Sequence, residues 1–309
     1  MYKVSVIGAG NVGATLAFQI AIRDLANVTL IDIVEDMPMG KALDMNQCSP
    51  LFDVDATVTG SNKLEDLADS DVVVITSGVP RKPGMDREDL LKINAGIMKD
   101  VCTMVKEKAP QSVVIVVTNP LDVMAWVASE VTGFPRERVI GMAGVLDAAR
   151  QRTFIAWELG VSPLDVAAMV MGGHGDTMVP LPRFSTVNGI PITELLPANR
   201  IEAIAHRTRT GGGEIVKLLK TGSAYYAPAA SAAVMVEAVL KDTGHLVPAS
   251  CYLTGQYGFS GIHFGVPCTI GSGGVRKIIE LGVNEPERMQ LQASAAVVRQ
   301  GIEDVAKFL

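Results

Sequence analysis

The residues best suited to chemistry lie in MGGHGDTMVP, the stretch Met171–Pro180. It contains His174, one of only four histidines in the chain. Three glycines, which lack a side chain, lie beside it in the sequence: Gly172, Gly173 and Gly175. We expect these glycines to leave room for a ligand beside the ring. Because imidazole titrates near neutral pH, His174 could exchange the proton of an alcohol. The alternative is a structural histidine, a role that better suits the other three: His206, His245 and His263.

A histidine with this task needs a buried carboxylate to hold its tautomer and stabilise its charged form. Asp176 is close in sequence, whereas Asp147 comes from a separate element and could approach the ring from behind. Arg150 follows Asp147 at i,i+3 on a helix predicted over 147–159, so the two share a face. The alternatives are a helix N-cap for Asp147 and an i,i+3 ion pair for Arg150.

Two further arginines, Arg81 and Arg87, occur in the loop GVPRKPGMDRED. This loop follows a predicted strand whose carboxyl end should border a ligand crevice. Gly78 and Gly84 are possible hinges for a loop that closes over the site. The alternative is a solvated basic loop.

The segment IGAGNVGA follows the first predicted strand and opens a helix, with glycines spaced as G-x-G-x-x-G. Such glycines permit a tight turn, close approach of a pyrophosphate and close helix packing. Asp32 ends the second strand, about 20 residues further on, where it can bind ribose hydroxyls and repel a 2′-phosphate. We therefore predict NAD rather than NADP, with these turn contacts: Gly8, Ala9, Gly10, Asn11, Val12 and Gly13. The alternative is an ordinary glycine turn and a strand-ending aspartate.

Another strand ends in VTN, so Val117, Thr118 and Asn119 should lie at the same edge of the sheet. Asn119 is predicted to contact ribose or substrate. The alternative is a turn asparagine before Pro120.

Alternating strands and helices predict an α/β fold with a doubly wound parallel sheet. Strands are predicted in KVSVIG, NVTLID, DATVTG, DVVVITSG, SVVIVVTN and RVIGMA. The pattern changes near Gly144, after which YLTGQYGFSGIHFGVPCTIG indicates antiparallel strands among long helices. We predict an NAD-binding domain over 1–144 and an α+β substrate domain over 145–309.

The amino-acid composition argues against several classes of protein function. The net charge of −6, without a dense Lys/Arg block, argues against a nucleic-acid surface. No uninterrupted apolar run approaches the ~18 residues of a membrane span, and the first residues lack a secretory-signal pattern. Four cysteines without CxxC or His/Cys metal spacing predict reduced thiols, no metal site and a cytoplasmic location.

Taken together, GAGNVG, GVPRKPGMDR, VTNPLD, GVLDAARQR and MGGHGDTMVP resemble malate dehydrogenases of the lactate-dehydrogenase-like group. The resemblance extends over essentially the whole chain, through TGSAYYAPA and YLTGQYG. It implies an NAD-dependent enzyme that interconverts malate and oxaloacetate, as a homotetramer or, alternatively, a homodimer.

The resemblance also implies a role for each site residue. His174 and Asp147 form the proton relay, and Arg150 holds the substrate's C1 carboxylate. Arg87 comes down with the loop and polarises the carbonyl, while Asn119 lies beside the substrate and Asn94 touches the cofactor.

Two other functions are compatible with parts of this pattern. A lactate dehydrogenase would share the fold and the relay, but that group usually has glutamine where this chain has Arg81. A non-catalytic NAD-binding protein would have no reason to keep these four residues together: His174, Asp147, Arg150 and Arg87.

Overall fold

The computed structural model describes residues 1–79 and 87–309, but not the side chain of Arg87. The predictions for Arg81 and for the Arg87 side chain therefore lie outside the described residues.

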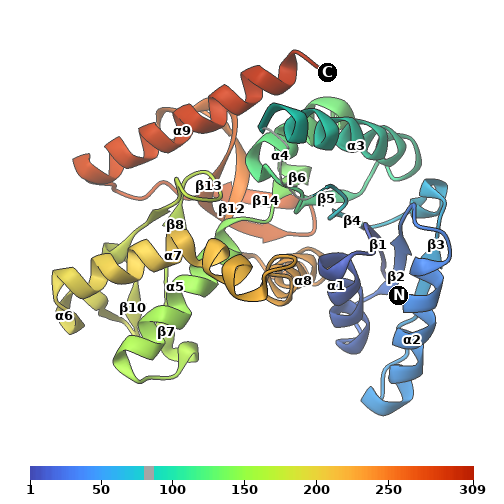
Figure 1. Cartoon of the computed structure of the whole chain (residues 1–309), viewed down its shortest axis with the longest axis horizontal. Helices are drawn as coiled ribbons and strands as arrows, with labels where there is room; N and C mark the ends of the chain where they lie inside the picture. Colours follow the sequence, from blue (N-terminus) through green and yellow to red (C-terminus); the bar gives the residue numbers. More distant parts are fainter. Residues whose placement is uncertain (80–86) are drawn as a thin grey trace.

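Within this part of the chain, one nine-stranded sheet runs in the order β14-β13-β12-β6-β5-β4-β1-β2-β3 (Figure 1). The parallel strands are β1 (Lys3–Ile7), β2 (Asn27–Ile31), β3 (Val58–Ser61), β4 (Val72–Ile75), β5 (Val113–Val116) and β6 (Val139–Gly141). Their order reverses between β1 and β4, which is where a doubly wound sheet opens a ligand crevice at the carboxyl ends of its strands. The predicted fold class is confirmed.

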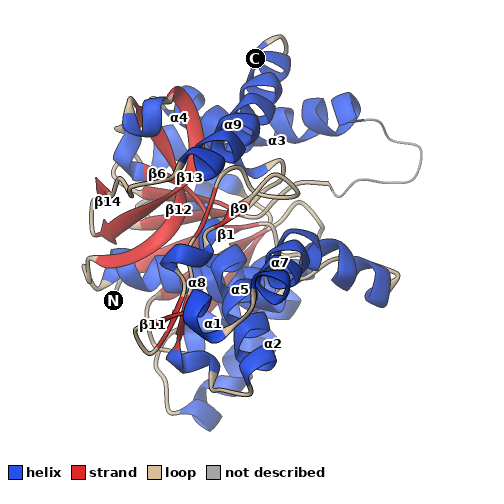
Figure 2. Cartoon of the chain, turned by 90° about the vertical axis from the view of Figure 1, so that its left-hand side faces the viewer, coloured by secondary structure: helices blue, strands red, loops and turns tan. Residues whose placement is uncertain are grey.

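The apolar runs of β4 and β5 arise because both faces of the sheet are covered. In β4, Val72 and Val74 pack into one core, whereas Val73 and Ile75 pack into another. Figure 2 shows α3, α4 and α9 on one side of the sheet and α1, α5 and α8 on the other. Alternate side chains are therefore buried on opposite faces, and neither set can be polar.

The longer helices occupy both halves of the chain. They are α1 (Asn11–Ile22), α2 (Met37–Phe52), α3 (Arg87–Lys108), α4 (Leu121–Thr132), α5 (Gly144–Leu159), α7 (Ala198–Leu219), α8 (Tyr226–Leu240) and α9 (Glu285–Ala306). None of the described helices is long and apolar enough to cross a bilayer.

Three antiparallel strands of the second half extend the sheet of the first half. They are β12 (His245–Thr254), β13 (Ser260–Gly271) and β14 (Gly274–Ile278). The junction pairs Ser250 of β12 with Gly141 of β6, where an added Cβ at Gly141 would lie 2.7 Å from the Ser250 Cβ. Strands from both sides of position 144 therefore belong to one sheet. The predicted division into 1–144 and 145–309 stays a prediction.

Short elements complete the second half. They are β7 (Val166–Ala167), β8 (Val170–Met171), β9 (Val179–Pro180), β10 (Thr186–Val187), β11 (Ile190–Pro191) and α6 (Ile192–Leu195). Strands β8 and β9 pair with each other and flank the loop that carries His174.

Helix α5 begins earlier than its sequence suggests. Its N-cap is Ala143, so Asp147 lies inside the first turn and does not cap the helix. An added Cβ at Gly144 would lie 2.6 Å from the Pro248 Cβ, so the first residue of the helix packs directly against β12. The N-cap alternative for Asp147 is therefore wrong, and its carboxylate is available for other partners.

The cysteines are free thiols, of which Cys102, Cys251 and Cys268 are buried. Burial raises the pKa of Cys102 to about 12, so this thiol stays protonated and unreactive at neutral pH. Among the described residues, no three His, Cys, Asp or Glu side chains are grouped to hold a metal ion.

Candidate active site

The glycine turn between β1 and α1 has the geometry of a phosphate-binding turn. Gly8 has φ +104°, which favours glycine, and an added Cβ at Gly13 would lie only 1.8 Å from the Gly8 carbonyl oxygen. At Gly10, the N-cap of α1, an added Cβ would meet no described atom within 4 Å. The turn therefore needs glycine at both ends for its own packing, while its centre leaves open space beside the helix N-terminus, where a pyrophosphate fits.

Asp32 closes this turn from the end of β2. One carboxylate oxygen accepts the Ala9 N–H at 2.6 Å, and the other accepts the Val34 N–H at 3.0 Å. Each carboxylate oxygen has a second lone pair, so ribose hydroxyls can still donate to it.

Lys41 of α2 is a neighbour of this site that the sequence analysis missed. Its Nζ donates to the Ala9 carbonyl oxygen at 2.6 Å, so a cation lies beside the turn. No motif spacing relates Lys41 to the glycines, because the contact depends on how α2 packs.

The predicted residues Val117, Thr118 and Asn119 follow directly after β5, at the carboxyl edge of the parallel sheet. Val117 and Thr118 are buried, and the Thr118 hydroxyl donates to the Ser77 carbonyl at 2.7 Å. Asn119 is exposed at the strand end, next to a cis peptide bond to Pro120.

Asn94 has a structural function that its sequence position did not reveal. Its buried amide accepts the Val79 N–H at 2.9 Å and donates to the Asn119 carbonyl at 2.8 Å. It thereby ties together the loops that follow β4 and β5. Its contact with the cofactor stays a prediction.

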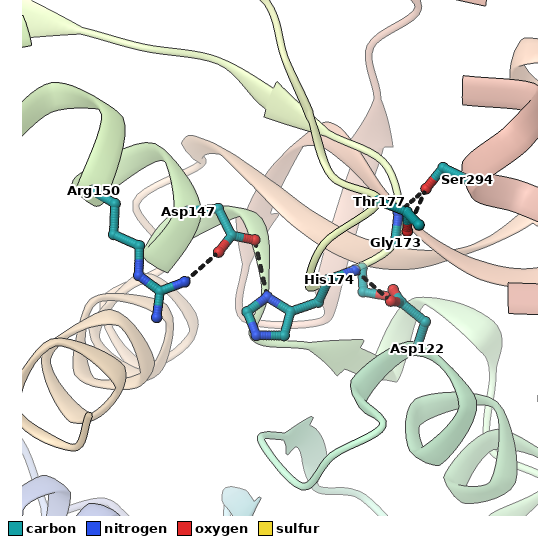
Figure 3. A network of polar contacts seen from close by, with 8 residues as sticks. Asp122, Asp147, Arg150, Gly173, His174, Thr177 and Ser294 are labelled. Atoms are coloured by element: carbon teal, nitrogen blue, oxygen red, sulfur yellow. Dashed lines mark hydrogen bonds and ion pairs between the residues drawn. The ribbon is translucent and has the colours of Figure 1, made fainter. Parts of the chain in front are cut away.

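Asp147 contacts two other predicted site residues, His174 and Arg150 (Figure 3). Its Oδ2 lies 2.9 Å from Nδ1 of His174, and its Oδ1 accepts from Nη1 of Arg150 at 3.2 Å. The Asp147 side chain is only 2% exposed, against 15% for His174 and 14% for Arg150. The acid partner of His174 is therefore Asp147 and not Asp176, and the predicted i,i+3 ion pair of Arg150 is also present.

The surroundings of His174 favour its protonated form. Burial opposes the charged imidazole, but the Asp147 carboxylate, helped by Asp122, outweighs it and raises the pKa of His174 above its ordinary value. The Arg150 guanidinium acts in the opposite direction, more weakly. A ring with these neighbours can accept a proton and release it again near neutral pH.

The loop of His174 is anchored from three elements. The Gly172 N–H donates to the Gly265 carbonyl of β13 at 2.9 Å, and the Gly173 N–H donates to Ser294 of α9 at 2.9 Å. The His174 N–H donates to Asp122 of α4 at 2.7 Å. Asp122 and Ser294 were not foreseen; the only signal was the acid in VTNPLD, at the start of a helix.

These anchors correct the explanation of the glycines. An added Cβ at Gly173 would lie 2.8 Å from Cγ2 of Val298, and one at Gly172 would lie 3.1 Å from the Ser294 hydroxyl. Gly172 also has φ +92°. Only Gly175 would place a Cβ where no described atom lies within 4 Å. Two of the three glycines therefore admit neighbouring helices and not a ligand.

Comparison with known proteins matches this architecture to one family. The NAD-binding domain of lactate/malate dehydrogenase matches residues 2–141, and the α/β C-terminal domain of the same family matches residues 144–309. The malate dehydrogenase of Thermomicrobium roseum is 58% identical, and that of a Roseiflexus species is 53% identical; each alignment covers 97% of both chains.

Solved structures agree along nearly the whole chain. The malate dehydrogenase of Picrophilus torridus is 46% identical with a TM-score of 0.97, over 99% of this chain and 98% of that one. A lactate dehydrogenase from Eimeria maxima, solved with NADH and oxamate, is 44% identical with a TM-score of 0.96, over 99% and 95%. The chain accordingly belongs to the lactate/malate dehydrogenase family of NAD-dependent oxidoreductases, with its NAD-binding domain in the first half of the chain.

Proposed function

We propose that this protein reversibly oxidises (S)-malate with NAD⁺, giving oxaloacetate, NADH and a proton. The observation that carries the proposal is the bridge made by Asp147, which lies 2.9 Å from the His174 ring and 3.2 Å from the Arg150 guanidinium. One buried carboxylate thereby orients both a proton acceptor and a carboxylate-binding group toward one substrate.

The orientation of the His174 ring determines which of its nitrogens can take the substrate proton. We assign Nδ1–H as the donor to Asp147. His174 Nε2, which has no partner among the described residues, then has its lone pair available for the hydroxyl proton of malate. Asp147 then stabilises the imidazolium that forms, as an acid partner does in other His–Asp pairs. NAD⁺, when bound, would supply the acceptor for the hydride that leaves the carbinol carbon. In the reverse direction, His174 returns its proton to the oxygen of the reduced carbonyl.

Substrate recognition is assigned to arginines. Within the described part of the chain only Nη1 of Arg150 has a hydrogen-bond partner, so the rest of its planar fork is free to hold the C1 carboxylate. Arg81 is assigned to the second carboxylate and Arg87 to the carbonyl oxygen, on sequence grounds alone. Asn119, exposed at the end of β5, is assigned to the substrate beside them.

The remaining assignments concern cofactor contacts and assembly. The nicotinamide and ribose contacts are assigned to Asn94, Val117, Thr118 and Asn119, and the pyrophosphate and adenosine contacts to the turn 8–13 and Asp32. The enzyme is proposed to work in the cytoplasm as a homotetramer, with a homodimer as the alternative. Sedimentation at equilibrium would distinguish these two assemblies.

The competing substrate is pyruvate, because the Eimeria maxima lactate dehydrogenase is almost as similar in structure as the Picrophilus torridus malate dehydrogenase. The discriminating experiment follows NADH absorbance with oxaloacetate and with pyruvate. We expect kcat/KM to favour oxaloacetate by at least two decades, since pyruvate lacks the second carboxylate that would pair with the guanidinium assigned to it. A preference for pyruvate would assign the chain to lactate chemistry, and no turnover of either acid would support a non-catalytic NAD-binding protein.

A further inference from the structure

Asp122, at the start of α4, is a buried carboxylate that the relay described above does not use. The residue is 4% exposed, and both of its carboxylate oxygens accept short hydrogen bonds. Oδ2 accepts the backbone N–H of His174 at 2.7 Å, and Oδ1 accepts the hydroxyl of Ser250 at 2.6 Å. Figure 3 shows it directly below the His174 loop, across from Asp147.

The environment of Asp122 suits an anion that has no cation of its own. No lysine or arginine of the described residues forms an ion pair with it. Instead, two donors and the positive end of the α4 dipole face the carboxylate. Burial raises the pKa of Asp122, and the two hydrogen bonds and the nearby His174 work against that rise. The charge most able to compensate this carboxylate is therefore a protonated His174.

We propose that Asp122 is a positioning residue of the proton relay: its buried carboxylate fixes the backbone of His174 and places a second anion beside the imidazole. The inference rests on the proposed function, in which His174 exchanges the substrate proton. Asp147 orients the ring through Nδ1, whereas Asp122 acts from the backbone side.

Among the described residues, few other groups face His174. Asp147 and Arg150 come from α5, and Asp176 is exposed in the same loop. The contacts from α9 and β13 are neutral, through Ser294, Val298 and Gly265. Arg81 and the Arg87 side chain lie outside the described residues, and they are identical in every variant compared below.

Ser294 provides a matched control. Its hydroxyl accepts the N–H of Gly173, the residue next to His174, so it anchors the same loop without carrying charge. Ser294→Ala removes an anchor only, whereas Asp122→Asn removes a charge and keeps the shape. The experiment measures kcat/KM for oxaloacetate reduction against pH in both variants, with NADH affinity and melting temperature as checks on folding.

We expect both variants to lower kcat, but only Asp122→Asn to move the pH profile. Reduction needs protonated His174, so kcat/KM falls as pH rises through the pKa of His174. Losing an anion at close range should shift this fall about one pH unit toward acid. A superimposable profile for Asp122→Asn, with Ser294→Ala equally slow, would reduce Asp122 to a loop anchor and overturn the proposal.

A direct titration keeps the test independent of turnover. The Cε1–H signals of the four histidines can be followed by NMR, with the His174 signal assigned through His174→Asn. The same downward shift is expected in Asp122→Asn, or in the smaller Asp122→Ser if the amide variant does not fold. If His174→Asn keeps normal turnover, the relay itself fails. If that variant is inactive while Asp122 variants leave the titration of His174 unchanged, only the present inference fails.

Discussion

At the scale of single residues, the site depends on one carboxylate shared between two functions. Asp147 is almost fully buried. One of its carboxylate oxygens contacts His174 and the other contacts Arg150. In the proposed mechanism this shared contact aligns the proton acceptor with the carboxylate-binding group, so that both are held in place relative to one substrate. Changes at Asp147 should therefore affect both chemistry and binding.

His174→Asn should lower kcat by about 10²–10⁴-fold, the usual contribution of general acid–base catalysis, with little change in NADH affinity. Asp147→Asn should also slow turnover, because an amide cannot stabilise the imidazolium, and should raise KM because Arg150 loses its partner. Steady-state kinetics and NADH fluorescence titration measure both effects. Near-normal turnover in His174→Asn would mean that His174 is structural.

Arg81→Gln removes the positive charge of Arg81 and so tests whether this residue selects a substrate with two carboxylates. Losing one partner of a buried charged pair costs roughly 3–5 kcal/mol, or about two to three and a half decades in kcat/KM. We expect oxaloacetate activity to fall by that factor and pyruvate activity to rise, because the stranded cation is gone. Arg87→Gln is the control and should slow both substrates. An unchanged ratio of the two activities would make Arg81 a solvated loop residue.

At the scale of elements, glycines mark where backbones approach each other closely. Gly13 lets α1 pack on the turn after β1, and Gly173 lets the His174 loop pack on α9. In both places a side chain would collide with atoms that cannot easily move. Gly10 differs, because an added Cβ there would meet no described atom within 4 Å, and we propose that the cofactor binds in this space.

This contrast predicts two different phenotypes. Gly13→Ala should weaken NADH binding and also destabilise the protein by about 1–3 kcal/mol, since its Cβ would overlap the Gly8 carbonyl. Gly10→Ala should weaken NADH binding and leave the melting temperature of the cofactor-free protein nearly unchanged. Calorimetry and fluorescence titration separate the two effects. Tight NADH binding by Gly10→Ala would show that the pyrophosphate lies elsewhere.

At the scale of the whole molecule, a buried polar contact joins the two halves of the chain beneath the site. His263 of β13 is fully buried, and its Nε2 lies 2.7 Å from the hydroxyl of Ser129 on α4, seven residues after Asp122. Burial, with a smaller contribution from Arg136, lowers the pKa of His263 to about 3. This histidine is therefore neutral in the folded protein and is a structural residue, as its sequence context suggested.

The folded protein should lose stability in mild acid because of His263. Between its ordinary pKa of 6.5 and about 3, the unfolded chain binds a proton that the folded one does not. The free energy of unfolding should therefore fall by up to about 1.4 kcal/mol per pH unit as the pH drops through this range. His263→Gln keeps a hydrogen-bonding side chain without the titration, so its melting temperature should fall less between pH 6 and pH 4. Parallel curves for the two proteins would contradict this account.

The sequence alone was enough to predict the doubly wound sheet and the NAD cofactor, which are confirmed, and to name His174 and Asp147 as candidates for a proton relay. Apolar runs such as that of β4 and the glycine spacing after β1 are local patterns, and each has few structural solutions. His174 was identified by its type and neighbours, and Arg150 by its distance from Asp147 along a helix. These predictions needed no knowledge of which elements touch.

Contacts between elements that are distant in sequence could be found only in the tertiary structure. Helix α5 begins at Gly144, packed closely against β12, so Asp147 lies inside its first turn, where it contacts His174. Likewise, Asp122, Ser294 and Lys41 reach the site from elements far away in sequence, so no spacing rule could find them. The physical reason is that a hydrogen bond is directional and short, and its partners are determined only when whole helices and strands have packed.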